Sequence, residues 1–230
     1  MTIFSRAVMA AVPVCALALT GTASAGIMLG ENLLNNHDAE AGPGGSGQVV
    51  PVPGWSVTEG LFTVAAYGSP GLLQAGDPGP PDRGNNYFMG GSAETSVAEQ
   101  RYNLFSLAAQ IDSGDLAVEL SGWLGTTVGQ PGDATLSVTF LDAAMMSLGT
   151  VTLGNIRGDG PAGGLFYFET DGVIPVGTRE AVVELSLFRG SSSALNHGSA
   201  DELSFTIVPG PSGAAVLVLG GLAATGRRRR

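Results

Sequence analysis

The residues of this sequence that could do chemistry are two histidines, many carboxylates and a few aromatic rings. His37 and His197 are the only histidines, and neither has a cysteine or a second histidine at a metal-ligand spacing. Twenty acidic residues supply carboxylate pairs such as Asp112 with Asp115. A glycosidase needs such a pair at a set separation across a cleft, which the sequence does not fix. The nucleophile pattern Gly-x-Ser-x-Gly is absent. We therefore expect a noncatalytic protein.

A second kind of site would use aromatic rings to bind the faces of sugars, provided that loops hold the rings in solvent. Tyr67 and Tyr87 flank a Gly/Pro-rich stretch, and His197 lies in the turn Asn196-His197-Gly198 before the last apolar segment. These three side chains are our predicted ligand contacts. Trp123 falls within an alternating segment and is predicted to be part of the core.

The charge of the chain excludes one class of partner and is unevenly distributed. Ten arginines, no lysine and twenty acids give a net charge of −10, which disfavours nucleic acid. Five of the ten arginines, Arg6 and Arg227–Arg230, lie in the two apolar ends. The remaining body therefore contains five arginines and all twenty acidic residues. That body has a net charge near −15, which argues against anionic partners and leaves neutral sugars or cation-bridged polysaccharide.

Residues 1–25 have the three parts of a secretory signal peptide. Arg6 supplies the positive charge, Ala7 to Thr20 are apolar, and Ala23-Ser24-Ala25 is a small-x-small cleavage site, so the mature chain should begin at Gly26. Cys15 is the only cysteine and would be removed with this segment. We expect export and a fold without disulfides.

The body alternates with period two, which is typical of half-buried antiparallel strands. Apolar and polar residues alternate in four segments, residues 116–121, 135–140, 183–187 and 203–207. Turns rich in Gly, Pro and Asp separate such segments, and no long helical stripe is present. This pattern predicts an all-β fold, a single antiparallel β-sandwich or jelly roll over residues 26–208, with long loops at Gly42–Pro53 and Gly68–Asn86.

The C-terminal residues combine a turn, an uncharged apolar stretch of fourteen residues from Gly213 to Gly226, and a basic end. Together they resemble the PEP-CTERM sorting signal of Gram-negative, exopolysaccharide-producing bacteria, with Gly210 where that motif usually has Glu. The matching residues are Val208, Pro209, Pro211, Ser212, Arg227, Arg228, Arg229 and Arg230. The resemblance implies a sorting tail over residues 209–230, a membrane helix in transit with its arginines on the cytoplasmic side, and processing by an exosortase at the cell surface.

A second resemblance spans most of residues 26–208. The segments Asn32–Glu40, Val52–Trp55, Leu120–Gly125 and Ala200–Phe205 occur in the order seen in galactose-binding-like β-sandwich domains, especially those akin to the F-box-associated glycan-binding domain. In related carbohydrate-binding modules, an N-terminal acidic segment and a C-terminal Asp share a structural calcium ion. Carried over, the resemblance implies Ca²⁺ held by Asp38, Glu40 and Asp201, with backbone carbonyls completing the shell.

Two functions from different classes follow from these observations. The first is an exported cell-surface or extracellular-matrix protein that binds carbohydrate or associates with exopolysaccharide without catalysis. The alternative is a structural or adhesive surface protein that binds other proteins. An enzyme is not expected.

Overall fold

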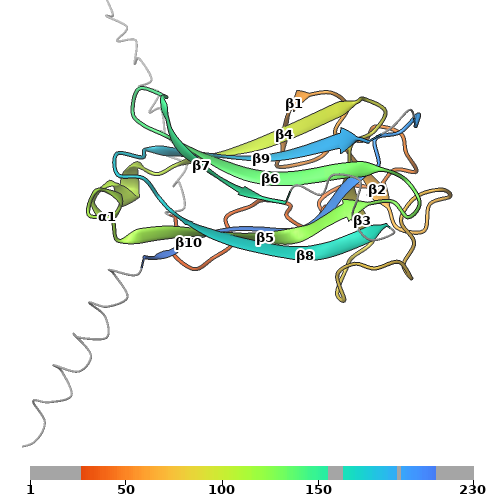
Figure 1. The fold of residues 1–230 in the computed structure, drawn as a ribbon, viewed down its shortest axis with the longest axis horizontal. Helices are drawn as coiled ribbons and strands as arrows, with labels where there is room; N and C mark the ends of the chain where they lie inside the picture. The colour runs from red at the N-terminus through yellow and green to blue at the C-terminus, as the bar shows by residue number, and fades with distance from the viewer. Residues whose placement is uncertain (1–26, 155–162, 191–192, 211–230) are drawn as a thin grey trace, which may run out of the picture.

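A computed structural model describes residues 27–154, 163–190 and 193–210 of the chain. Ten strands and one short helical segment lie in these residues, so the all-β prediction is confirmed (Figure 1). The strands are β1 (Ser56–Glu59), β2 (Thr63–Ala66), β3 (Asn86–Met89), β4 (Thr95–Asn103), β5 (Leu116–Thr126), β6 (Gly132–Leu141), β7 (Ser147–Leu153), β8 (Gly164–Val173), β9 (Glu180–Arg189) and β10 (Gly198–Pro209). A 3₁₀ turn (Phe105–Leu107) leads into the five-residue helix α1 (Ala108–Asp112).

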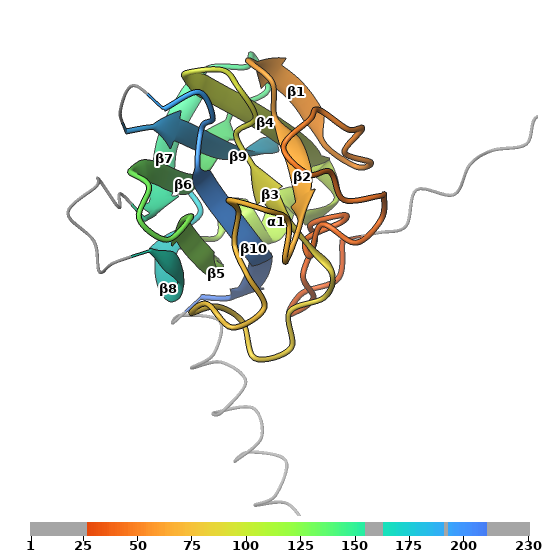
Figure 2. The ribbon, with the colours of Figure 1, turned by 90° about the vertical axis from the view of Figure 1, so that its right-hand side faces the viewer.

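Two five-stranded antiparallel sheets pack face to face. Their strand orders are β1-β4-β9-β6-β7 and β2-β3-β10-β5-β8. From β3 onward most connections cross from one sheet to the other, as in jelly rolls, and Figure 2 shows the two layers end-on. The galactose-binding-like assignment is finer than this arrangement and stays a prediction.

The predicted alternation places one side of each strand in the core. In β6, Leu136, Val138 and Phe140 are buried between the sheets, while the threonines and serine between them are partly exposed. The same alternation runs along β5, β9 and β10. Burying an aliphatic side chain of this kind stabilises the fold by about 1.5–3 kcal/mol, so this inter-sheet core is what holds the sandwich together.

The N-terminal segment lies against the last strand. The amides of Gly30 and Leu33 donate to the carbonyls of Ile207 and Phe205, each at 2.9 Å. Asn32 forms the isolated bridge to Thr206, and its side chain both donates to Leu203 O and accepts from Phe205 N. One bridge and these bonds hold the segment against β10, but it forms no strand of its own.

Both predicted long loops are confirmed, because no strand lies between residues 42 and 53 or between Tyr67 and Asn85. The second loop is packed down by its own side chains. Leu72 and Leu73 join Ala65, Tyr87, Met89 and Leu165 in a small cluster on the outer face of the second sheet. Arg83 donates to the carbonyls of Gln74, Asp77 and Pro80 and so closes the loop from inside.

The two ends bear on several predictions. The signal peptide, with Ala23 and Ala25, and the tail from Pro211 onward, with Ser212 and the four arginines, lie outside the described residues. Val208 and Pro209, predicted to begin a turn, are instead the last residues of β10, where they pair with Ala117 and Leu116. Within the described ranges, no helix has the length and apolar character needed to cross a membrane.

Candidate functional site: a groove on the outer face of a sheet

Three neighbouring strands, β8, β5 and β10, present a polar outer face. Because antiparallel partners lie directly opposite each other, their outward side chains form ranks across the strands. The successive ranks are Tyr167–Trp123–Asp201, Glu169–Ser121–Ser204 and Asp171–Glu119–Thr206. Aromatic rings therefore stand at one end of this face, and hydroxyls and carboxylates cover the rest.

The polar ranks line a groove of about 440 Å³. The lining residues come only from β5, β8 and β10: Glu119, Leu120, Ser121, Tyr167, Glu169, Thr170, Asp171, Ser204 and Thr206. The volume lies within the range of small-molecule sites, which combine apolar surface with a few placed polar groups. Rigid strands hold every one of these side chains, so the groove is preformed.

The aromatic end of the groove consists of two rings in contact. The centroids of Trp123 and Tyr167 are 5.8 Å apart with their planes inclined at 58°. Trp123 is partly buried against the small outer cluster, whereas the side chain of Tyr167 is 50% exposed. Trp123 therefore does not belong to the core between the sheets, contrary to the prediction, and its ring contacts that of its cross-strand partner Tyr167.

Hydrogen bonds fix part of the groove and leave carboxylates free for a ligand. The Tyr167 hydroxyl donates to Glu169 Oε2 at 3.0 Å, and the hydroxyls of Ser204 and Thr206 share a bond at 3.2 Å. Glu119 and Asp171 lie directly opposite each other in the sheet. Neither takes part in the ion pairs found among the described residues.

Asp201 lies behind the aromatic end and is completely buried. Its Oδ2 accepts from the Tyr67 hydroxyl at 2.8 Å, and its Oδ1 accepts from the backbone amide of Glu202 at 2.8 Å. Burial is the main reason why the pKa of Asp201 is raised from 3.8 to about 7, and the charges of Glu202 and Glu40 act in the same direction. Glu202 follows at a positive φ of 46°, where β10 bulges, and Asp201 shares the outer face with its partner Trp123.

The predicted tyrosine ligands lie together, but neither of them offers a free ring face. The rings of Tyr67 and Tyr87 are 4.8 Å apart, and the Arg83 guanidinium lies 5.2 Å from the Tyr67 centroid. Tyr87 is 0% exposed, because the loop carrying Leu73 covers it, so its ring cannot receive a sugar. Burial also raises the pKa of Tyr87 to about 12. Tyr67 is partly exposed, but its hydroxyl is committed to Asp201 and its ring is covered by Arg83.

His197 is also not the exposed ligand contact that the turn predicted. Its side chain is 5% exposed, its Nδ1 has no hydrogen-bond partner, and burial lowers its pKa. It lies outside the groove, at the start of β10. The local sequence Asn-His-Gly predicts a surface turn, but Asn196 is itself buried and its side chain donates to the backbone carbonyl of Leu187.

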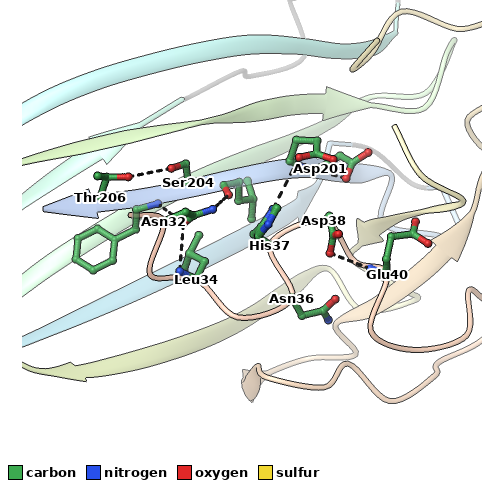
Figure 3. Close-up of polar contacts among 12 residues, drawn as sticks. Asn32, Leu34, Asn36, His37, Asp38, Glu40, Asp201, Ser204 and Thr206 are labelled. Carbon is green, nitrogen blue, oxygen red and sulfur yellow. Dashed lines mark hydrogen bonds and ion pairs between the residues drawn. The ribbon is translucent and has the colours of Figure 1, made fainter. Parts of the chain in front are cut away.

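The residues implied for calcium do not form a calcium cage (Figure 3). Glu40 Oε1 accepts from the amides of Asn85 and Asn86 at 2.6 and 2.7 Å, which ties the N-terminal segment to the long loop. Asp38 accepts from the amide of Glu40, and Asp201 is committed as described above. No group of three or more His, Cys, Asp or Glu side chains in the described part of the chain is placed to hold a metal ion. These carboxylates are thus engaged with protein donors and are not grouped as a metal site in the described residues, and Ca²⁺ binding stays a prediction.

The carboxylate pairs noted in the sequence have structural partners. Asp112 binds Arg179 through two bonds of 3.0 and 2.7 Å, and these lower its pKa, while Asp115 accepts from Ser113. Glu202 lies 3.8 Å from His37 Nδ1. None of these five acidic or basic residues lines the groove.

Comparison with known proteins supports the fold and assigns no function. No family model matches the chain, and no curated protein is similar to it in sequence. Among solved structures, a Stig cyclase, Fisc, from Fischerella sp. TAU has a TM-score of 0.50 at 12% identity, covering 77% of this chain and 97% of the cyclase. At that identity the likeness concerns the fold alone.

Two other solved structures are more distant. The enzymatically active domain of tailspike protein 4 from bacteriophage CBA120 has a TM-score of 0.46 at 15% identity, covering 77% of this chain and 21% of the tailspike chain. This chain thus spans about a fifth of the tailspike chain. The CBM22-1 xylan-binding domain from Paenibacillus barcinonensis has a TM-score of 0.37 at 13% identity, covering 71% of this chain and 92% of that domain.

The groove residues were missed by sequence reasoning that looked for ligands in loops. The signal was present in the strand pattern, because Trp123 has the same parity as Glu119 and Ser121 and must share their outer face. Tyr167, Glu169 and Asp171 have the same spacing on β8. The informative feature was an aromatic residue at a strand position that the alternation assigns to the polar face.

Proposed function

We propose that this chain is an exported, noncatalytic protein of the cell surface or extracellular matrix that binds polysaccharide in the groove. The observation that carries the proposal is the half-exposed ring of Tyr167 beside a strip of hydroxyls and carboxylates. A sugar offers an apolar face to an aromatic ring and hydroxyls to hydrogen-bonding groups, and the groove supplies both. The ring of Tyr167 and the carboxylates of Glu169 and Asp171 follow one another along β8, which suits a chain of sugars better than a single one.

Binding can be tested with the purified mature protein against a panel of immobilised polysaccharides. We expect retention by at least one of them, and Tyr167→Ala should weaken this binding by about tenfold or more, as for a central aromatic contact. Phe188→Ala is the matched control, because Phe188 is a 41% exposed ring on β9 of the other sheet. Equal loss in both variants, or no retention by any polysaccharide, would refute the proposal. Turnover of a bound polymer would refute the noncatalytic part alone.

Export and sorting form a separate part of the proposal. The signal peptide would direct secretion, and the tail would hold the protein in the inner membrane until an exosortase-type enzyme processes it. When the full-length chain is expressed, cell fractionation of the host should find the protein at the surface or in the matrix. A chain truncated after Gly210 should instead stay in the periplasm, and an unchanged distribution would refute the sorting role.

A protein-binding, adhesive role remains the alternative, and one observation favours it. Met145, Met146 and Leu148 are exposed around the β6–β7 hairpin, far along the sandwich from the long loops. Exposed apolar residues that lie together can mark a contact with another protein. Association of the protein with itself or another protein, lost on changing these three residues to Ser and insensitive to sugar, would favour this role.

A further inference from the structure

We infer that the groove selects polysaccharides whose sugars carry protonated amines, such as partly deacetylated hexosamine polymers, over neutral or acidic polymers. This inference rests on the proposed polysaccharide binding and adds the charge of the ligand.

The first observation is the uncompensated charge of the groove. Glu119, Glu169 and Asp171 all line it and are exposed, and no arginine, lysine or histidine is among its nine lining residues. The arginines with known contacts serve other sites. Arg101 pairs with Glu99 and Glu180, Arg179 pairs with Asp112, and Arg83 closes the long loop.

The second observation is that two of these carboxylates oppose each other across neighbouring strands. Glu119 on β5 is the direct partner of Asp171 on β8. Directly opposed side chains have their β-carbons about 4.5–5.5 Å apart, and like charges at this position destabilise a sheet. A cationic group placed between the two carboxylates removes this repulsion, whereas a neutral sugar leaves it in place and a uronic acid increases it.

The third observation is the order of groups along β8. Tyr167, Glu169 and Asp171 are two residues apart on one face, so ring, carboxylate and carboxylate follow at intervals of about 7 Å. The Tyr167 hydroxyl donates to Glu169, which holds that carboxylate beside the ring. A sugar stacked on Tyr167 can thus present an amine to Glu169, and the sugars that follow along the chain meet the Glu119–Asp171 pair.

Isothermal titration with sugar oligomers of matched length tests the inference. The probes are glucosamine oligomers, their N-acetylated forms, neutral xylose oligomers and uronic acid oligomers, at a pH where the amines are protonated. We expect glucosamine oligomers to bind about tenfold more tightly than the acetylated ones, the sum of several solvent-exposed ion pairs. The preference should shrink strongly at about 1 M salt, where the screening length is only about 3 Å.

Matched variants separate the carboxylates from the ring. Glu119→Gln with Asp171→Asn leaves Glu169 in place, so it should reduce the preference for amines severalfold but keep the residual binding of acetylated oligomers. Tyr167→Ala should weaken the binding of both kinds of oligomer. Glu59→Gln with Glu184→Gln removes the same two charges from β1 and β9 of the other sheet and should keep the preference. Because the groove substitutions remove a repulsion, they should leave the melting temperature unchanged or raise it, and each can also be made alone.

The outcomes distinguish this inference from the proposed function. Equal affinity for glucosamine and acetylated oligomers, or a preference that is undiminished in the Glu119→Gln, Asp171→Asn variant, would overturn the amine selectivity and leave polysaccharide binding standing. Failure of every oligomer and polymer to bind would refute both. A melting temperature that rises with Ca²⁺ in the parent protein but not in the Glu119→Gln, Asp171→Asn variant, and that is unaffected by glucosamine oligomers, would assign these carboxylates to a metal and overturn the inference.

Discussion

Replacing the buried carboxylate Asp201 with Asn should change how the stability of this protein depends on pH. Asn has the same shape and no charge, and it can keep both contacts. Its carbonyl can accept from the Glu202 amide, and its amide group can donate to the Tyr67 hydroxyl, which can also act as an acceptor. The substitution therefore removes the ionisation of residue 201 with little change in packing.

The magnitude follows from the pKa of Asp201, which is about 7 in the folded protein against an ordinary value of 3.8. In the unfolded chain the carboxyl loses its proton near pH 4, but in the folded protein it keeps the proton until near pH 7. The favourable contribution is complete below about pH 4 and is lost as the pH rises through about 7. A difference of about 3 pKa units corresponds to about 4 kcal/mol of unfolding free energy.

Urea unfolding of the mature protein and the Asp201→Asn variant, measured in steps from about pH 4 to pH 8, gives this quantity directly. We expect the free energy of unfolding of the variant, relative to the parent, to rise by about 4 kcal/mol over this interval. Glu202, whose pKa burial raises, and His197, whose pKa burial lowers, also make stability pH-dependent, with opposite signs. Both are present in the two proteins, so comparing the proteins isolates Asp201.

A difference between the two proteins that stays constant from about pH 4 to pH 8 would refute this reasoning, because Asp201 would then ionise alike in the folded and unfolded chains. Glu59→Gln removes a carboxylate from the exposed strand β1 and controls for the change in net charge. It should show no comparable trend with pH.

Three further predictions concern the N-terminal segment and the ends of the chain. Glu40→Ala leaves the amides of Asn85 and Asn86 without their acceptor and should lower the free energy of unfolding by about 1–3 kcal/mol. Glu40→Gln keeps a carbonyl acceptor and should lower it less. Equal stability of the three proteins would show that Glu40 does not hold the long loop to the N-terminal segment. Because Glu40 and Asp201 accept hydrogen bonds from protein donors, the melting temperature should be the same in EDTA and in millimolar Ca²⁺. A melting temperature that rises with Ca²⁺ would instead support the calcium site implied by the second resemblance. Mass spectrometry of the exported protein should find Gly26 as its first residue, and an uncleaved N-terminus would remove the signal-peptide assignment.

The sequence by itself determined the class of fold, because the period-two alternation in β5, β6, β9 and β10 is a local property of each strand. It also located both long loops through their Gly and Pro content. It could not determine the ends of the last strand, since Val208 and Pro209 look like a turn but are held by pairing with residues more than 90 positions earlier.

The groove was decided by tertiary structure. Alternation showed that Glu119, Ser121 and Trp123 share a face, but it could not show that β8 and β10 flank β5 in the register that opposes Glu119 to Asp171. The solvent exposure of individual side chains was equally undetermined by the sequence. Tyr87 and His197 lie in polar, turn-rich sequence, yet the loop that carries Leu73 covers the first, and the packing around Asn196 buries the second. Burial depends on segments that are distant in sequence. Tyr67 and Tyr87, which predicted an open ligand site, therefore lie in a closed outer cluster, and the accessible ring is that of Tyr167 on a strand.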